Sequence, residues 1–149
     1  MARVSVEQLL RAPVLLHGIQ LGRPVDVVLD RDRRRALGLE IHCGDEARRF
    51  LPITVLRLGE AGIELASPLV LLEGRELTFY AERGSTLSGL RNAAVVDDGE
   101  RIGTLADVEL EPDGTIAEIV VSTESGRRRI AYGPGVVLVP PPRRVRAAS

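Results

Sequence analysis

The chain has one cysteine, one methionine, no tryptophan and no lysine. A single cysteine excludes an intramolecular disulfide framework and any zinc site built from several cysteines. The aromatic residues, two Phe and two Tyr, are too few for a surface on which nucleic-acid bases stack. The 20 arginines face 21 acidic residues, and the resulting net charge of −1 argues against a dedicated nucleic-acid binder.

A long apolar run is missing as well. The longest uncharged segment, residues 130–142, contains four prolines and two glycines, and is too short and too interrupted to cross a bilayer as a helix. The N-terminal residues show no secretory signal, because Glu7 and Gln8 interrupt their apolar pattern. These features favour a cytoplasmic protein.

What the chain does have is an internal repeat. Shifting the sequence by 81 residues aligns residues 5–32 with residues 86–113 without a gap. Nine of the 28 aligned positions are identical, where chance gives about two. The identical pairs are Leu9/Leu90, Ala12/Ala93, Val14/Val95, Gly18/Gly99, Gly22/Gly103, Asp26/Asp107, Val27/Val108, Leu29/Leu110 and Asp32/Asp113.

Alternation of apolar and polar residues in both copies predicts antiparallel β-strands with one buried face. The positions expected to face the core are Leu21, Val25, Val27 and Leu29 in the first copy, and Ile102, Ala106, Val108 and Leu110 in the second. A Pro-Asp-Gly-Thr turn at residues 112–115 predicts a hairpin, whereas the first copy turns through residues 30–34 without a glycine. Further strands are expected at residues 37–41, 48–51 and 63–65, matched by residues 117–121, 127–130 and 136–139.

The segments outside the strands have their own patterns. A Ser or Thr precedes the first apolar residues of each copy, at Ser5 and Thr86, and predicts a capped helical turn. Within the linker, residues 67–85, a short helix is expected over residues 73–84 and ends at Gly84. Residues 140–149, rich in proline and arginine, predict an extended, mobile tail.

The order and spacing of glycines and aliphatic residues resemble the PRC-barrel domain, which is found in the photosynthetic reaction centre H subunit and in the ribosome-maturation factor RimM. Residues 9–65 match one such domain, and residues 90–139 match a second, which departs from the family pattern at residues 132–135. The matching positions are Pro13-Val14, Gly18, Gly22, Asp26-Val27, Leu29, Gly38 and Leu51-Pro52 in the first copy, and Gly99, Gly103, Asp107-Val108 and Leu110 in the second.

The resemblance implies a mainly β fold of two small PRC-type β-barrels in tandem, related by a pseudo-twofold axis. The repeats would cover residues 5–66 and 86–139. It also implies no catalytic residues and no cofactor. The motif residues are interpreted as structural. Gly18, Gly22, Gly99 and Gly103 would serve turns or close backbone approach, and Asp26 and Asp107 would accept backbone N–H bonds.

The sequence contains few candidates for catalytic or metal-binding residues. His42 and Cys43 are neighbours on a predicted strand and point to opposite faces, so they cannot readily bind one metal ion. We interpret Cys43 as a buried core residue. His17 lies in a turn, and no serine has the nucleophile–base pattern of a hydrolase. We therefore expect no metal site and no enzyme.

Arginine clusters are the best candidates for partner binding. They occur at Arg48-Arg49, Arg127-Arg128-Arg129 and Arg143-Arg144. One interpretation is a charged edge strand that discourages aggregation. The other is a patch that binds an anionic surface of a partner, including RNA or acidic lipid headgroups.

The function predicted from the sequence is a non-enzymatic protein–protein docking module of the PRC-barrel type, whose partner the sequence does not name. The alternative is an RNA-associated ribosome-assembly factor resembling RimM. Against it, RimM has a different barrel at its N-terminus, where this chain has a PRC-like copy. Peripheral association with a membrane complex and homo-oligomerisation both stay open.

Overall fold

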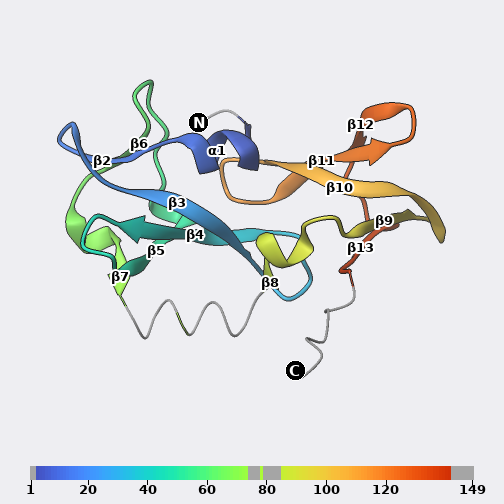
Figure 1. The fold of residues 1–149 in the computed structure, drawn as a ribbon, viewed down its shortest axis with the longest axis horizontal. Coiled ribbons are helices and arrows are strands. Elements are labelled where there is room, and N and C mark those ends of the chain that lie inside the picture. The colour runs from blue at the N-terminus through green and yellow to red at the C-terminus, as the bar shows by residue number, and fades with distance from the viewer. Residues whose placement is uncertain (1–2, 74–77, 79–84, 142–149) are drawn as a thin grey trace, which may run out of the picture.

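A computed structural model describes residues 3–73, 78 and 85–141 of the chain. The protein is mainly β and contains two sheets (Figure 1). The first sheet has the order β6-β2-β3-β4-β5-β7, with β8 also pairing with β3. Its strands are β2 (Val14–Leu16), β3 (Ile19–Leu29), β4 (Ala36–Cys43), β5 (Arg48–Pro52), β6 (Ile63–Leu65), β7 (Leu72–Glu73) and β8 (Ser85–Thr86).

The second sheet is formed by the other repeat. Its order is β12-β11-β10-β9-β13, with β1 also pairing with β10. Its strands are β1 (Val4–Ser5), β9 (Ala94–Asp97), β10 (Glu100–Leu110), β11 (Ile116–Thr123), β12 (Gly126–Ala131) and β13 (Val136–Val139). The helical elements are α1 (Val6–Arg11) and the 3-10 turns η1 (Ile53–Val55), η2 (Pro68–Val70) and η3 (Ser88–Leu90).

The capped turn expected at Ser5 is confirmed, whereas Thr86 lies one residue before Leu87, the N-cap residue of η3, which makes no side-chain capping bond. The Ser5 hydroxyl accepts a hydrogen bond from the backbone N–H of Gln8 at 3.1 Å, at the start of α1. The Thr86 hydroxyl accepts one from the N–H of Gly89 at 3.3 Å, beside η3. The same local chemistry therefore begins each repeat.

The predicted inward-facing positions are wrong in one place in each copy. Val25 is 41% exposed, and its counterpart Ala106 is exposed as well. The cause is a β-bulge, because the pairing register shifts between Pro24 and Asp26 on β3 and between Leu105 and Asp107 on β10. A bulge inserts one residue and breaks strict alternation. The bulges occupy equivalent positions in the two repeats.

The repeats exchange their opening segments. β1, which begins the first repeat, pairs with β10 of the second, with Val4 opposite Leu110. β8, which leads into the second repeat, pairs with β3 of the first, with Ser85 opposite Leu29. α1 follows β1 and lies between β3 and β10 at the centre of the molecule (Figure 1). These contacts are reciprocal, because each sheet contains the opening strand of the other repeat.

A second reciprocal contact joins the tips of the β3–β4 and β10–β11 hairpins. Arg35 and Thr115 form an isolated antiparallel bridge. The N–H of Ala36 donates to the carbonyl of Gly114 at 2.8 Å, and the N–H of Ile116 donates to the carbonyl of Arg34 at 2.9 Å. The two sheets are therefore connected through their backbones.

One hydrophobic core extends through both repeats. It includes Leu39 and Ile41 of β4 and their counterparts Ile119 and Val121 of β11, all with no exposed surface. Leu9 of α1 belongs to the same cluster. The repeats thus share an interior.

The outer faces of the two sheets differ. In the first repeat, Val28 and Phe50 on this face are 1% and 0% exposed. In the second repeat, the corresponding positions on β10 and β12 are Glu109 and Arg129, which form an ion pair at 2.7 Å. At these two positions the first repeat is therefore apolar and buried, and the second is charged.

The closing strands also break the repeat. β6 pairs in parallel with β2, whereas β13 pairs antiparallel with β9. The helix predicted over residues 73–84 begins wrongly, because Glu73 belongs to β7. Of the other residues in that prediction only Thr78 is described, and it is helical. The predicted tail lies mostly outside them too. Among the described helices, none has the length and apolar character that crossing a membrane requires.

Candidate functional site

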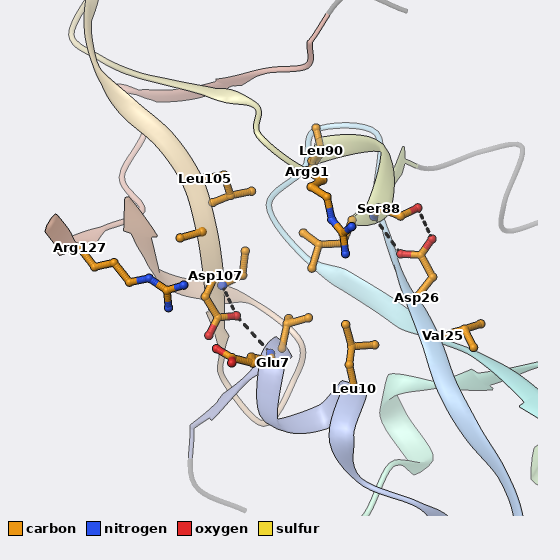
Figure 2. A pocket seen from close by; sticks show the side chains of 14 residues that line it. Glu7, Leu10, Val25, Asp26, Ser88, Leu90, Arg91, Leu105, Asp107 and Arg127 are labelled. Carbon is orange, nitrogen blue, oxygen red and sulfur yellow. Dashed lines mark hydrogen bonds between the residues drawn. The ribbon is translucent and has the colours of Figure 1, made fainter. Parts of the chain in front are cut away.

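A cleft lies between the two repeats, beside α1 and η3, and has a volume of about 320 Å³ (Figure 2). Most of its lining consists of equivalent positions from the two copies. These pairs are Val6/Leu87, Glu7/Ser88, Leu10/Arg91, Val25/Ala106 and Asp26/Asp107. Leu90, Leu105, Val108 and Arg127 complete the lining. The cleft is therefore a product of the duplication.

Apolar groups form the floor of the cleft. Val6 and Leu90 are each 1% exposed and come from the two exchanged helical segments. Val25 and Ala106 remain accessible because the two bulges turn them away from the core. An accessible apolar surface in a concave site is a common feature of sites that bind ligands or partner side chains.

Asp26 connects β3 to the start of η3. One carboxylate oxygen accepts hydrogen bonds from the N–H groups of Val27 at 2.8 Å and Ser88 at 3.0 Å. The other accepts one from the Ser88 hydroxyl at 2.5 Å, and Figure 2 shows both bonds to Ser88. The residue is only 8% exposed, so these bonds compensate for the loss of water around its charge. Asp26 thus holds the second repeat's helical turn on the first repeat's sheet.

Asp107 has the matching position in the second repeat. One of its oxygens accepts hydrogen bonds from the N–H of Val108 at 2.8 Å and from the N–H of Glu7 at 3.1 Å (Figure 2). Glu7 lies in the first turn of α1. Each aspartate therefore binds the helical segment of the other repeat, and both carboxylates serve the structure of the cleft walls.

Two arginines contribute positive charge to the cleft. Arg91 follows η3 and Arg127 belongs to β12, and both line the cavity. In Figure 2 the Arg91 side chain extends between the elements of the two repeats. Neither guanidinium forms a side-chain hydrogen bond or ion pair with any residue that the structure describes. Both are available to an anionic group of a ligand or partner.

No protein-family model matches this chain, and no curated protein matches it.

The motif glycines lie outside the cleft, in two roles. Gly18 and Gly99 have φ of 79° and 83° in the turns that lead into β3 and β10. A side chain at Gly22 would collide with the carbonyl of His42, and one at Gly103 with the carbonyl of Ser122. These glycines therefore permit tight turns and close strand approach.

Some arginines of the clusters form ion pairs with acidic residues, and others do not. Arg48 contacts Glu40 at 2.9 Å, and Arg129 contacts Glu109. Arg127 and Arg128 have no ionic partner within residues 3–73, 78 and 85–141. Arg143 and Arg144 lie outside the described residues.

Arg49 is held by two acidic residues. Its guanidinium binds both carboxylate oxygens of Asp45, at 2.8 and 3.0 Å, and its Nε contacts Glu73 at 3.1 Å. Hydrogen bonds from Arg49 and from the N–H of Ala47 lower the pKa of Asp45 to about 2. Arg49 therefore connects a loop and β7 to β5.

The expectations for histidine and cysteine are met in their geometry. Cys43 is buried at 5% exposure. His42, on the other face of β4, has its Nε2 3.2 Å from a carboxylate oxygen of Glu46. No group of three or more potential metal ligands occurs among the described residues.

Residue patterns missed three components of the cleft. Strict alternation assigns Val25 and Ala106 to the core, because it has no signal for a bulge. Arg91 was not singled out, although the repeat aligns it with Leu10. The change from apolar Leu10 to cationic Arg91 is the sequence signal that could have indicated a polar rim on the cleft.

Proposed function

We propose that the chain is a non-enzymatic protein docking module of the PRC-barrel type, and that the cleft between its repeats receives an apolar side chain of a protein partner. The observation that carries the proposal is the accessible apolar lining that Val25 and Ala106 contribute to the cleft. Two bulges at equivalent positions keep these residues out of the core.

The polar groups around the floor support docking over catalysis. Asp26 and Asp107, the two aspartates that line the cleft, both accept backbone hydrogen bonds from the neighbouring helical segments. Arg91 and Arg127 would pair with acidic groups beside the apolar side chain of the partner. Such a buried apolar anchor with a polar rim is the usual anatomy of a protein interface.

The test compares Val25→Asp with Val55→Asp, a matched control with 38% exposure on η1 in the first repeat. Both changes place a carboxylate on an accessible valine, so both variants should fold. We expect proteins captured from the native host by the unmodified chain to be retained by Val55→Asp and lost by Val25→Asp. With a purified partner, the loss should correspond to about 2 kcal/mol, or roughly thirtyfold in affinity.

The same experiment separates the alternative function. Binding that disappears after nuclease treatment, and that weakens steeply with salt, would support the RNA-associated role instead. Equal retention by the two variants would contradict docking at the cleft.

A further inference from the structure

β12 is an edge strand with unusual exposure. In the described part of the chain it pairs only with β11, and its outer edge is open. Residues 126–129 are all exposed. An open edge presents unpaired backbone N–H and C=O groups, which can pair with another strand.

The first repeat contains the counterpart of this edge. Arg49 on β5 lies opposite Ile41, and Arg128 on β12 lies opposite Val121. Ile41 and Val121 are equivalent positions of the repeat. Arg49 and Arg128 are therefore structural counterparts, on strands that hold the same place in their sheets.

The counterpart edge on β5 is occupied. β7 pairs with it antiparallel, placing Leu72 opposite Phe50 and Glu73 opposite Arg49. The Glu73 carboxylate contacts the Arg49 guanidinium at 3.1 Å. The molecule thus shows which chemistry fits this edge: an extended segment with an acidic residue beside an aliphatic one.

Neither β12 of a second copy of this chain nor residues 142–149 can supply such an acidic segment to β12. A second copy of the chain pairing through its own β12 would place arginines against arginines, and like charges on facing strands repel. Residues 142–149 contain three arginines and no Asp or Glu, so they cannot provide the carboxylate.

We propose that β12 binds an acidic, extended segment of a partner protein as an added antiparallel strand, with a Glu or Asp of that segment opposite Arg128. The inference rests on the docking function and specifies its partner. Neighbouring residues of a strand point to opposite faces, and Arg127, next to Arg128, lines the cleft. The added strand would therefore lie beside the cleft, and those of its side chains that share the face of Arg127 would extend the docking surface.

The binding test uses the full chain and a labelled six-residue peptide of alternating valine and glutamate, blocked at both ends. We expect fluorescence anisotropy to show binding that Arg128→Glu weakens at least tenfold and Arg128→Gln weakens less. Arg57→Glu is the matched control, because Arg57 is an exposed arginine of the first repeat without an ion pair in the described residues. That variant should bind like the unmodified chain.

Strand addition also has a backbone signature. Amide hydrogen exchange within residues 126–131 should slow when the peptide binds, because outward N–H groups become paired. Equal binding of a valine–glutamine peptide, equal losses in the Arg128 and Arg57 variants, or no added protection would each overturn the proposal. Unchanged affinity in Arg128→Glu would leave the edge arginines with an anti-aggregation role. A uridine oligomer that displaces the peptide and binds more tightly would identify RNA as the ligand instead.

Failure here is distinguishable from failure of the docking function. Val25→Asp should abolish docking at the cleft and leave peptide binding intact. If partner capture depends on Val25 while the peptide ignores Arg128, the strand proposal alone is wrong.

Discussion

Single arginines join the two repeats of this protein. The guanidinium of Arg34, from the first repeat, lies 4.3 Å from the ring centre of Tyr132 and donates to the carbonyls of Gly133 and Val136, both at 2.9 Å. The Tyr132 hydroxyl donates to the carbonyl of Arg33 at 2.7 Å. Burial raises the pKa of Tyr132. A planar, multidentate cation suits this role better than lysine would.

Asp45 provides a residue-scale prediction. Its folded pKa, about 2, lies below its ordinary value of 3.8, so the stabilisation from its contact with Arg49 is complete above pH 3.8 and is lost as the pH falls through about 2. In Arg49→Gln, the pKa of Asp45 should rise toward 3.8, as measured by carboxylate NMR titration. Asp113 is the control, because hydrogen bonds from Thr115 hold its pKa down. A rise at both residues, or at neither, would refute the assignment.

At the scale of elements, local sequence patterns predict most strands, but they do not predict the bulges or which sheet β1 and β8 join. Alternation located β3, β4 and their counterparts, and Gly114 with its φ of 92° turns the predicted second hairpin. The bulge at Val25 was missed because an added residue leaves local composition unchanged. The sequence does not predict the exchange of opening strands. Because the repeats are similar, β1 and β8 could each pair equally well with the long strand of its own repeat or of the other. The cleft depends on both features, so its apolar floor could not be predicted.

The exchange itself predicts an energetic coupling between β3 and η3. Asp26→Ala removes three hydrogen bonds, two of them to Ser88, and should lower the free energy of unfolding by about 3 kcal/mol. Ser88→Ala should cost less, and a double-mutant cycle should give a coupling of about 1–3 kcal/mol. Asp107→Ala, which loses two backbone contacts, should cost about 1 kcal/mol. Urea denaturation measures all four variants, and additive effects of Asp26 and Ser88 would contradict the coupling.

The whole molecule behaves as one unit in its packing. β1 and β8 each belong to the sheet of the other repeat, the hairpin tips share backbone hydrogen bonds, and a single core includes residues of both copies. Removing either repeat would leave the other with an unpaired strand position and an open core.

This arrangement predicts one cooperative unfolding transition. Methyl NMR signals of Ile41 in the first repeat and Ile119 in the second should disappear at the same urea concentration. Leu39→Ala, in the core of the first repeat, should destabilise the protein by about 3 kcal/mol and shift both signals together. Separate midpoints, or a shift confined to Ile41, would show that the repeats fold independently.

The outer-face positions that differ between the repeats, Val28 and Phe50 against Glu109 and Arg129, have a consequence for how the sequence of such a protein can change. In a homodimer encoded by a single gene, each substitution appears in both subunits, so an apolar face such as that of Val28 and Phe50 would be present twice. Fusion of the two copies in one chain removes this constraint. The Glu109–Arg129 side could therefore acquire charge while the Phe50 side retained its covered surface.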